Sequence, residues 1–207
     1  GRSFWDQDFS FDSMAEDISN YLKFKNISKV DMLGHSMGGN LAIYISNKTP
    51  NILNKIVIVD VVPKIYKNMH QDILSGLKSI DFNLIGSRRE ADDKLSSYIS
   101  DERVRHFLLK NLYWKSEHKL GFRFNLDVLY GYSKNSITNK FENPISFKGP
   151  ALFLHGKSSN YVNEQDYELI NYHYSNASII KVPNSGHWLH ADNPDFFLEK
   201  TINFLNS

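Results

Sequence analysis

The sequence predicts an α/β fold in which helices cover a mostly parallel sheet. Short apolar runs alternate along the chain with longer segments of helical periodicity, which is the pattern of strand–helix–strand units. The run Ile56–Val59 is apolar on both faces, as expected for a strand covered by helices on both sides. With 207 residues, 41% of them apolar, the chain is long enough to bury one sizeable core.

The elements follow one another in a regular order. We expect a first helix from the spacing of Met14, Ile18 and Leu22, and a second helix that ends close to Pro50. A closing helix begins at Pro194, because proline in the first helical turn loses no hydrogen bond. Four strands are predicted at Val30–Leu33, Ile56–Val59, Ala151–Leu154 and Ala177–Val182.

A long insert, residues 64–148, separates the second and third predicted strands. Its patterns are helical, with one stripe at Ile73, Leu74, Leu77 and Ile80, and it shows no strand pattern. Asp101 and Asn125 are candidate N-caps of two further helices. We interpret the insert as a helical lid, so that residues 1–207 form one domain.

Composition excludes several classes of function. The net charge of +1 gives no electrostatic basis for binding nucleic acid or an anionic membrane. The chain has no cysteine, so a thiol cannot be the nucleophile. No apolar run is long enough to span a bilayer, and no signal peptide is visible. We expect a soluble protein, cytoplasmic or, in a eukaryote, mitochondrial, that acts on a small molecule without nucleic acid or stable membrane insertion.

A candidate nucleophile lies in the segment Gly34-His35-Ser36-Met37-Gly38-Gly39, which matches G-x-S-x-G. A strand is predicted before this motif and a helix after it, as a nucleophile elbow requires. The turn is tight enough to strain the serine, and neighbouring residues with Cβ atoms would clash. Ser36 is therefore predicted to stand at a helix N-terminus, where developing negative charge is favoured. The alternative is a glycine-rich turn with an inactive serine.

His187 is the candidate general base. Among the eight histidines, His187 follows the last predicted strand in a short polar loop, as the chain order serine, acid, histidine requires. His190 is its rival, although a hydrogen-bonded loop histidine is the favoured interpretation of that residue. His35 lies inside the elbow and is expected to be structural. No metal-ligand spacing is visible, and we expect neither a metal nor an organic cofactor.

Asp60 is the candidate acid. Most serine hydrolases of this architecture take the acid from the loop after the strand predicted at Ala151–Leu154, but no carboxylate follows directly there. Glu164 and Asp166 come later, in the first turn of the next helix. Asp60 closes the preceding strand at the carboxyl edge of the sheet, where it can orient His187. A plain turn or helix cap is the alternative role for Asp60.

These motifs resemble the YbfF-like esterases and acyl-CoA thioesterases of the α/β-hydrolase superfamily, with mitochondrial relatives and yeast ethanol acetyltransferases more distant. The resemblance covers nearly the whole chain. It implies an α/β-hydrolase fold, an acid at Asp60, a serine at Ser159 that hydrogen-bonds the Asp60–His187 pair, and one oxyanion-hole N–H from Met37. A plain loop serine is the alternative role for Ser159. It is based on Gly34–Gly39, Val59–Pro63, Arg89–Ala91 with Leu95, Val104–Leu109, Ser159–Val162 and Gly186–Ala191.

The resemblance also implies strands and a His-Gly loop ahead of Gly1. That loop would donate the second oxyanion N–H. Without those strands, Val30–Leu33 would lie at an open sheet edge. We therefore expect a missing N-terminal segment, or a partner chain, to complete the sheet.

The function expected from these residues is hydrolysis of carboxylic esters or thioesters, including acyl-CoA, through an acyl-enzyme on Ser36. Trp188, Tyr161 and Phe107 are expected to contact the small-molecule acyl substrate. One alternative is an acyltransferase that uses the same acyl-enzyme, with an alcohol in place of water. The other is a ligand receptor without catalysis, against which the intact serine, aspartate and histidine set argues.

Overall fold

The structure, a computed structural model, describes residues 5–66, 70–117, 119–134, 141 and 143–207. The chain divides into two compact units. One, the sheet unit, comprises residues 11–65 and 138–207, and the other, the insert unit, comprises residues 1–10 and 66–137.

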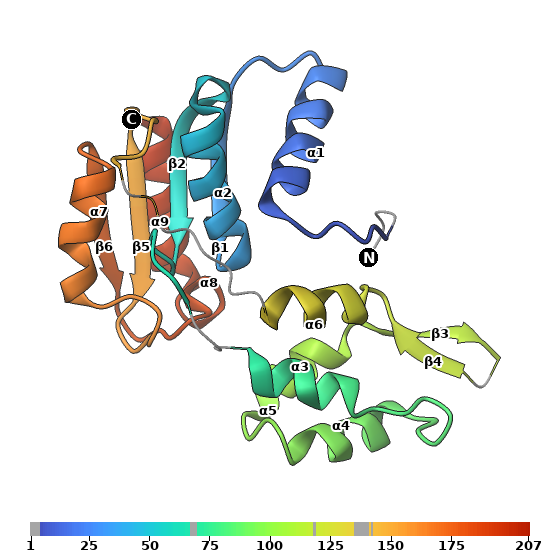
Figure 1. Ribbon diagram of the computed structural model, residues 1–207. Helices are drawn as coiled ribbons and strands as arrows, with labels where there is room; N and C mark the ends of the chain where they lie inside the picture. The colour runs from blue at the N-terminus through green and yellow to red at the C-terminus, as the bar shows by residue number, and fades with distance from the viewer. Residues whose placement is uncertain (1–4, 67–69, 118, 135–140, 142) are drawn as a thin grey trace. The chain divides into compact units, whose positions relative to one another are not determined.

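A four-stranded parallel sheet forms the centre of the sheet unit (Figure 1). The strand order is β1-β2-β5-β6, and every neighbouring pair is parallel. This confirms the predicted α/β class and all four predicted strands. Their bounds are β1 Val30–His35, β2 Leu53–Val59, β5 Ala151–Gly156 and β6 Ala177–Val182.

Alternate residues of the two central strands pack against opposite helical layers. Val57 and Val59 of β2 and Leu152 and Leu154 of β5 share one buried cluster with apolar residues of α9 (Pro194–Asn206). Successive side chains of a strand point to opposite faces, so the remaining residues of β2 and β5 face the other layer. Both faces are covered, which explains why β2 is apolar from Ile56 to Val59 and β5 from Ala151 to Leu154.

The opposite layer contains α2 (Met37–Lys48) and α7 (Tyr167–His173). Phe153 of β5 meets the ring of Tyr174, directly after α7, at a centroid distance of 5.2 Å. The Tyr174 hydroxyl and the hydroxyl of Ser46 in α2 are 2.7 Å apart and both buried, so one hydrogen bond joins the two helices beneath the sheet. The 3-10 turns η1 (Pro50–Ile52) and η2 (Glu164–Asp166) and the short helix α8 (Leu189–Asp192) complete the connections.

The first helix, α1 (Phe11–Phe24), packs on α2. It is amphipathic, with Phe11, Ala15 and Leu22 buried along one side. The ring of Phe11 lies 5.8 Å from that of Tyr44 in α2. The helices predicted around Met14–Leu22 and before Pro50, and the closing helix from Pro194, are therefore present.

The insert unit is mainly helical but contains a β-hairpin, which corrects the expectation that the insert has no strands. The two antiparallel strands of the hairpin, β3 and β4, pair Leu112 with Phe122 and Trp114 with Leu120. Each is short, and Leu112 and Phe122 join the same apolar cluster as the helices, so no alternating pattern is long enough to reveal them. The elements are α3 Gln71–Lys78, α4 Arg88–Ser96, α5 Glu102–Leu109, β3 Leu112–Ser116, β4 Lys119–Phe122 and α6 Leu126–Lys134.

Side chains cap the N-termini of α4, α5 and α6 in this unit. Ser87 and Glu90 form a capping box at α4, and the Asp101 side chain accepts from the N–H of Arg103 at α5. The Asn125 side chain accepts a hydrogen bond from the backbone N–H of Val128 in α6, as expected for its predicted N-cap role. Within the same unit, the indole of Trp5 donates to the carbonyl of Arg123 over 3.2 Å.

No helix among the described residues is long and apolar enough to cross a membrane.

Candidate active site

The candidate residues meet at the carboxyl edge of the parallel sheet. Ser36 directly follows β1 and Asp60 directly follows β2, on neighbouring strands. The Ser36 N–H donates to the carbonyl of Val59 over 3.0 Å, and the Asp60 N–H donates to the carbonyl of Leu154 over 2.8 Å. The pairing of the strands therefore continues into both residues and places them side by side.

Both residues have a strained backbone. Ser36 and Asp60 each have a φ of 55°, in the left-handed region that residues with a Cβ rarely occupy. In Ser36 this turn joins β1 directly to α2, so that the serine is the N-cap of the helix. The motif predicts the strain at Ser36, whereas nothing in the sequence indicates it at Asp60.

The elbow glycines are not equivalent. A Cβ on Gly34 would lie 2.2 Å from the carbonyl oxygen of Gly38, and a Cβ on Gly39 would lie 2.6 Å from a methyl of Val61. A Cβ on Gly38 would meet nothing within 4 Å. The crowding expected from G-x-S-x-G is therefore real at Gly34 and Gly39, but not at Gly38.

Asp60 is completely buried and has three hydrogen-bond donors. Its Oδ1 accepts from the backbone N–H of Gly156 over 3.0 Å. Its Oδ2 accepts from the hydroxyl of Ser159 and from Nδ1 of His187, the latter over 2.7 Å. These donors replace the hydration that the carboxylate loses on burial.

His187 connects this carboxylate to the candidate nucleophile. A carboxylate only accepts, so Nδ1 holds the proton and donates to Asp60. Nε2 then has a free lone pair, which accepts from the Ser36 hydroxyl over 3.0 Å. The neutral tautomer set by Asp60 therefore presents a base to the serine proton.

His35 attaches the His187 loop to the elbow. Its Nε2–H donates to the backbone carbonyl of His187 over 2.8 Å, and burial lowers the pKa of His35 to about 4. The ring is therefore neutral at pH 7 and acts through this hydrogen bond. His190, the rival base, lies in α8 with its ring 4.8 Å from that of His35. The sequence predicts a structural role for His35 but indicates no partner, because the bond joins residues far apart in the chain.

Tyr161 lies flat against the imidazole of His187. The two ring centroids are 3.7 Å apart and the planes differ by 13°. The backbone N–H of Tyr161 donates to the hydroxyl oxygen of Ser159 over 3.1 Å. Burial raises the pKa of its phenol to about 12, so the ring is uncharged. This residue was expected to contact substrate, and no feature of the sequence indicates its stacking on histidine.

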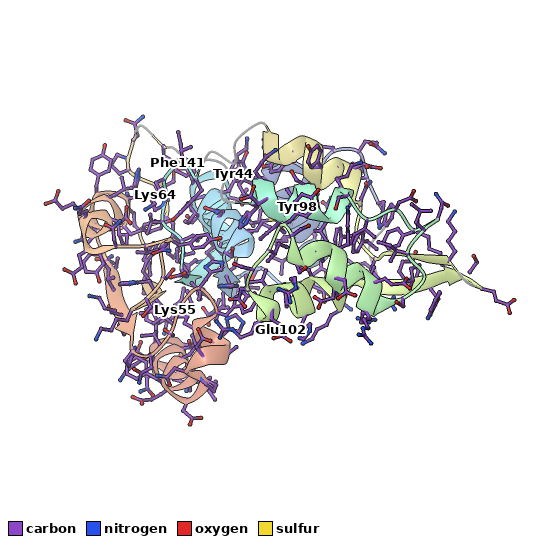
Figure 2. The ribbon with its side chains drawn as sticks, turned by 90° about the horizontal axis from the view of Figure 1, so that it is seen from below. Tyr44, Lys55, Lys64, Tyr98, Glu102 and Phe141 are labelled. Carbon is purple, nitrogen blue, oxygen red and sulfur yellow. The ribbon has the colours of Figure 1, made fainter. Side chains whose placement is uncertain are left out.

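The rival carboxylates are held in ion pairs elsewhere. Figure 2 labels Lys64, whose Nζ lies 2.7 Å from Oδ2 of Asp166. Glu164 pairs with Lys181, and hydrogen bonding to that lysine lowers the pKa of Glu164. Both acids belong to η2, the first turn before α7, as the sequence predicts.

The remaining candidates fall in different places. Met37 is the first residue of α2, and the N–H groups of a first helical turn have no partner within their own helix. Trp188 directly follows His187 and precedes α8. Phe107 is an exposed residue of α5 in the insert unit. Among the described residues, no three His, Asp or Glu side chains gather in a way that would hold a metal ion.

Comparison with known proteins shows the family of this chain. A family model described as the alpha/beta hydrolase fold matches residues 2–90. A Haemophilus influenzae protein whose name describes an esterase/lipase is 33% identical over 208 residues, covering 100% of this chain and 70% of its own length. The chain belongs to the α/β-hydrolase family. Within that family, it groups with ester hydrolases.

Other relatives of this hydrolase are also named as esterases or lipases. The solved structure of a marine microorganism esterase is 34% identical with a TM-score of 0.91, covering 99% of this chain and 80% of that structure. Esterase YbfF of Escherichia coli is 28% identical, covering 100% of this chain and 79% of the enzyme, which confirms the resemblance seen in the motifs. The sn-1-specific diacylglycerol lipase ABHD11 of Danio rerio is 33% identical and covers 95% of this hydrolase. The chain spans 63% of the length of that lipase.

Proposed function

We propose that this hydrolase cleaves carboxylic esters of small molecules through an acyl-enzyme on Ser36. The observation that supports the proposal most directly is the unbroken hydrogen-bond chain from Ser36 through His187 to Asp60. A serine hydroxyl is a weak nucleophile by itself, and a neighbouring oriented imidazole activates it.

The reaction follows from the positions of the protons. Ser36 Oγ forms a bond to the acyl carbon while its proton passes to Nε2 of His187. The bond from the acyl carbon to the leaving oxygen then breaks, and that oxygen takes the proton from Nε2. A water molecule next attacks the acyl carbon and gives a proton to Nε2 of His187. The bond from that carbon to Ser36 Oγ then breaks, Oγ takes the proton back from Nε2, and the acid product leaves.

Two charges develop during the reaction, one on the imidazolium and one on the oxyanion, and the site has groups for each. Asp60 holds the Nδ1–H and stabilises the imidazolium, while Ser159 donates to Asp60 on its other side. The N–H of Met37, in the first turn of α2, would donate to the oxyanion of the tetrahedral intermediate. Trp188 and Phe107 remain our candidates for contacts with the acyl group.

The test compares the protein with its Ser36→Ala variant on a panel of p-nitrophenyl esters and acyl-CoAs. We expect the substitution to lower kcat by about 10⁶-fold, as in serine hydrolases that lose the nucleophile. A fluorophosphonate probe should label the unchanged protein at Ser36. Ser96→Ala, on an exposed turn of α4, is the matched control and should retain both activity and labelling. Labelling or turnover that survives Ser36→Ala would reject the proposal, and binding of an ester without turnover or labelling would indicate a receptor instead.

A second candidate is acyl transfer to an alcohol. It is favoured by a relative of this chain, ethanol acetyltransferase 1 of Wickerhamomyces anomalus, 22% identical over 99% of the chain. The same acyl-enzyme would serve, with an alcohol taking the place of water. Product analysis with and without ethanol separates the two functions, because transfer forms an ethyl ester in place of part of the free acid. The acyl-CoA substrates in the panel test thioester cleavage in the same way.

A further inference from the structure

Two hydrogen bonds hold the nitrogens of the His187 ring but do not by themselves restrain small tilts of its plane. Nδ1 is bonded to Asp60 and Nε2 to Ser36, and both nitrogens flank Cε1 on one edge of the ring. The ring is attached to the backbone through the rotatable Cα–Cβ and Cβ–Cγ bonds, so small changes in these two torsions can still turn its plane. Such a turn moves the in-plane lone pair of Nε2 away from Ser36 Oγ and weakens the proton transfer, because hydrogen bonds depend on angle as well as distance.

The ring of Tyr161 supplies the missing restraint. With the centroids 3.7 Å apart and the planes within 13°, the phenol covers one face of the imidazole at van der Waals contact. A tilt of the imidazole toward that side is blocked by the phenol, and a tilt away from it breaks the stacking.

Tyr161 is itself attached to the acid side of the site. Its backbone N–H donates to Ser159 Oγ over 3.1 Å, and that hydroxyl donates to Asp60. The loop after β5 therefore contacts the base through a ring and the acid through a serine. A residue placed only to bind substrate would need neither contact.

The stacking also matters when His187 becomes charged. The face of an aromatic ring carries partial negative charge and attracts a cation placed over it. In acyl transfer the imidazole is neutral at the start and becomes an imidazolium as it takes the Ser36 proton. The phenol face therefore favours the state that forms during the reaction over the resting state.

We propose that Tyr161 is a positioning residue, whose ring fixes the plane of His187 and stabilises the imidazolium formed during acyl transfer. The inference rests on the proposed function of Ser36 and His187, and it replaces the expectation that Tyr161 contacts the acyl group.

The test compares Tyr161→Phe, which keeps the ring, with Tyr161→Leu, which keeps an apolar side chain but loses the π face. We expect the Leu variant to lower kcat by about 3- to 30-fold with little change in KM, from the usual strength of such ring–cation contacts. The Phe variant should stay within about threefold of the unchanged protein in kcat. The rate at which a small fluorophosphonate labels Ser36 should fall in the Leu variant in parallel with kcat, because labelling needs the base but little of the acyl pocket.

Other outcomes overturn the inference. A raised KM with unchanged kcat and labelling rate in the Leu variant would mean that Tyr161 contacts substrate. Equal losses in the Phe and Leu variants would mean that the hydroxyl, not the ring, matters. The melting temperature of each variant shows whether that variant is folded. If the Leu variant is not folded, the kcat of the Phe variant still shows whether the hydroxyl is needed. Ser36→Ala is assayed alongside: if Ser36 is labelled and required while the Leu variant is unaffected, only the role of Tyr161 fails.

Discussion

Asp60 is the residue whose placement most affects the chemistry. It lies one strand nearer to Ser36 than the loop that usually supplies the acid, and it receives three hydrogen bonds while fully buried. A buried carboxylate with this many donors is held in one orientation, so the tautomer of His187 is fixed as well. The two carboxylates after β5 are engaged by lysines instead.

The first prediction follows from that arrangement. Asp60→Asn should lower kcat by roughly 10³- to 10⁴-fold while the protein stays folded, because a neutral amide no longer fixes the Nδ1–H tautomer or stabilises the imidazolium. Steady-state kinetics on a short p-nitrophenyl ester, with circular dichroism as the check on folding, measure the effect. Asp166→Asn and Glu164→Gln are matched controls with little expected effect. A large loss in Glu164→Gln together with a small one in Asp60→Asn would assign the acid to the loop after β5.

Ser159 gives a second prediction at this scale. Ser159→Ala removes one of the three donors to Asp60 without removing any charge, so we expect a loss in kcat of roughly tenfold, between the wild-type and Asp60→Asn values. The neighbouring Ser158→Ala variant is the control, because Ser158 donates to the carbonyl of Ser185 through its backbone N–H, which the substitution keeps. The kinetics of both variants are measured on the same ester. Equal kcat values for the two variants would show that the Ser159 hydroxyl does not support the acid.

At the scale of elements, the nucleophile depends on how closely β1 and α2 approach each other. The carbonyl of Gly38, in the first turn of α2, lies where a Cβ of Gly34 would be. The same closeness recurs across the site, because a Cβ on Gly156 at the end of β5 would lie 2.1 Å from the carbonyl of Gly186. Strand ends and loops therefore meet backbone to backbone, and small residues are required at these points.

The third prediction separates the two glycines of the motif. Gly34→Ala should abolish measurable ester hydrolysis or prevent folding, because the new methyl meets backbone atoms that belong to α2 and cannot move independently. Gly38→Ala should keep activity within about threefold and raise the melting temperature slightly, since alanine favours a helix over glycine by about 1 kcal/mol. Thermal unfolding and ester kinetics on the pair provide the test. A Gly38→Ala variant as damaged as Gly34→Ala would contradict the open space found at Gly38.

For the whole molecule, one half-buried and two buried histidines of the sheet unit couple stability to pH. Burial lowers the pKa of His35 to about 4, and it also lowers the pKa values of His155 and His173. His155 is almost completely buried on β5, where its Nε2 lies 2.7 Å from the Tyr167 hydroxyl. In the unfolded chain these rings would titrate near their ordinary value of 6.5.

The fourth prediction takes its sign from that difference. Between the lowered folded values and about 6.5 the unfolded chain binds more protons, so the free energy of unfolding falls as the pH is lowered through this range. The contribution is complete above pH 6.5 and is lost toward pH 4. Urea unfolding between about pH 7 and about pH 5 should show this decline. His155→Gln should make it shallower, and His106→Gln, at an exposed position on α5, is the control. An unchanged slope in His155→Gln would exclude His155 as a source of the pH dependence.

Part of this molecule is determined by local signals in the sequence. The apolar runs of β2 and β5 identify the central strands, since each strand needs apolar residues on both faces. The elbow motif predicts Ser36 and its strain, and the proline at the start of α9 marks where that helix begins. Chain order indicates His187, and the gap after β5 indicates Asp60. The strand, elbow and helix-start signals are each contained within a few neighbouring residues, whereas those for His187 and Asp60 depend on the order of elements along the chain.

Other features depend on residues far apart in the chain, and only the tertiary structure decides them. The hairpin β3–β4 forms because Leu112 and Phe122 complete a cluster of helical side chains, although each strand is too short to show a pattern. The stacking of Tyr161 on His187 and the bond from His35 to the same loop arise where three strand ends converge. The sequence by itself therefore determined the fold class and the candidate chemical groups. The packing of the sheet decided how the base is held, because the distances and ring planes involved depend on how separate strands are placed against one another.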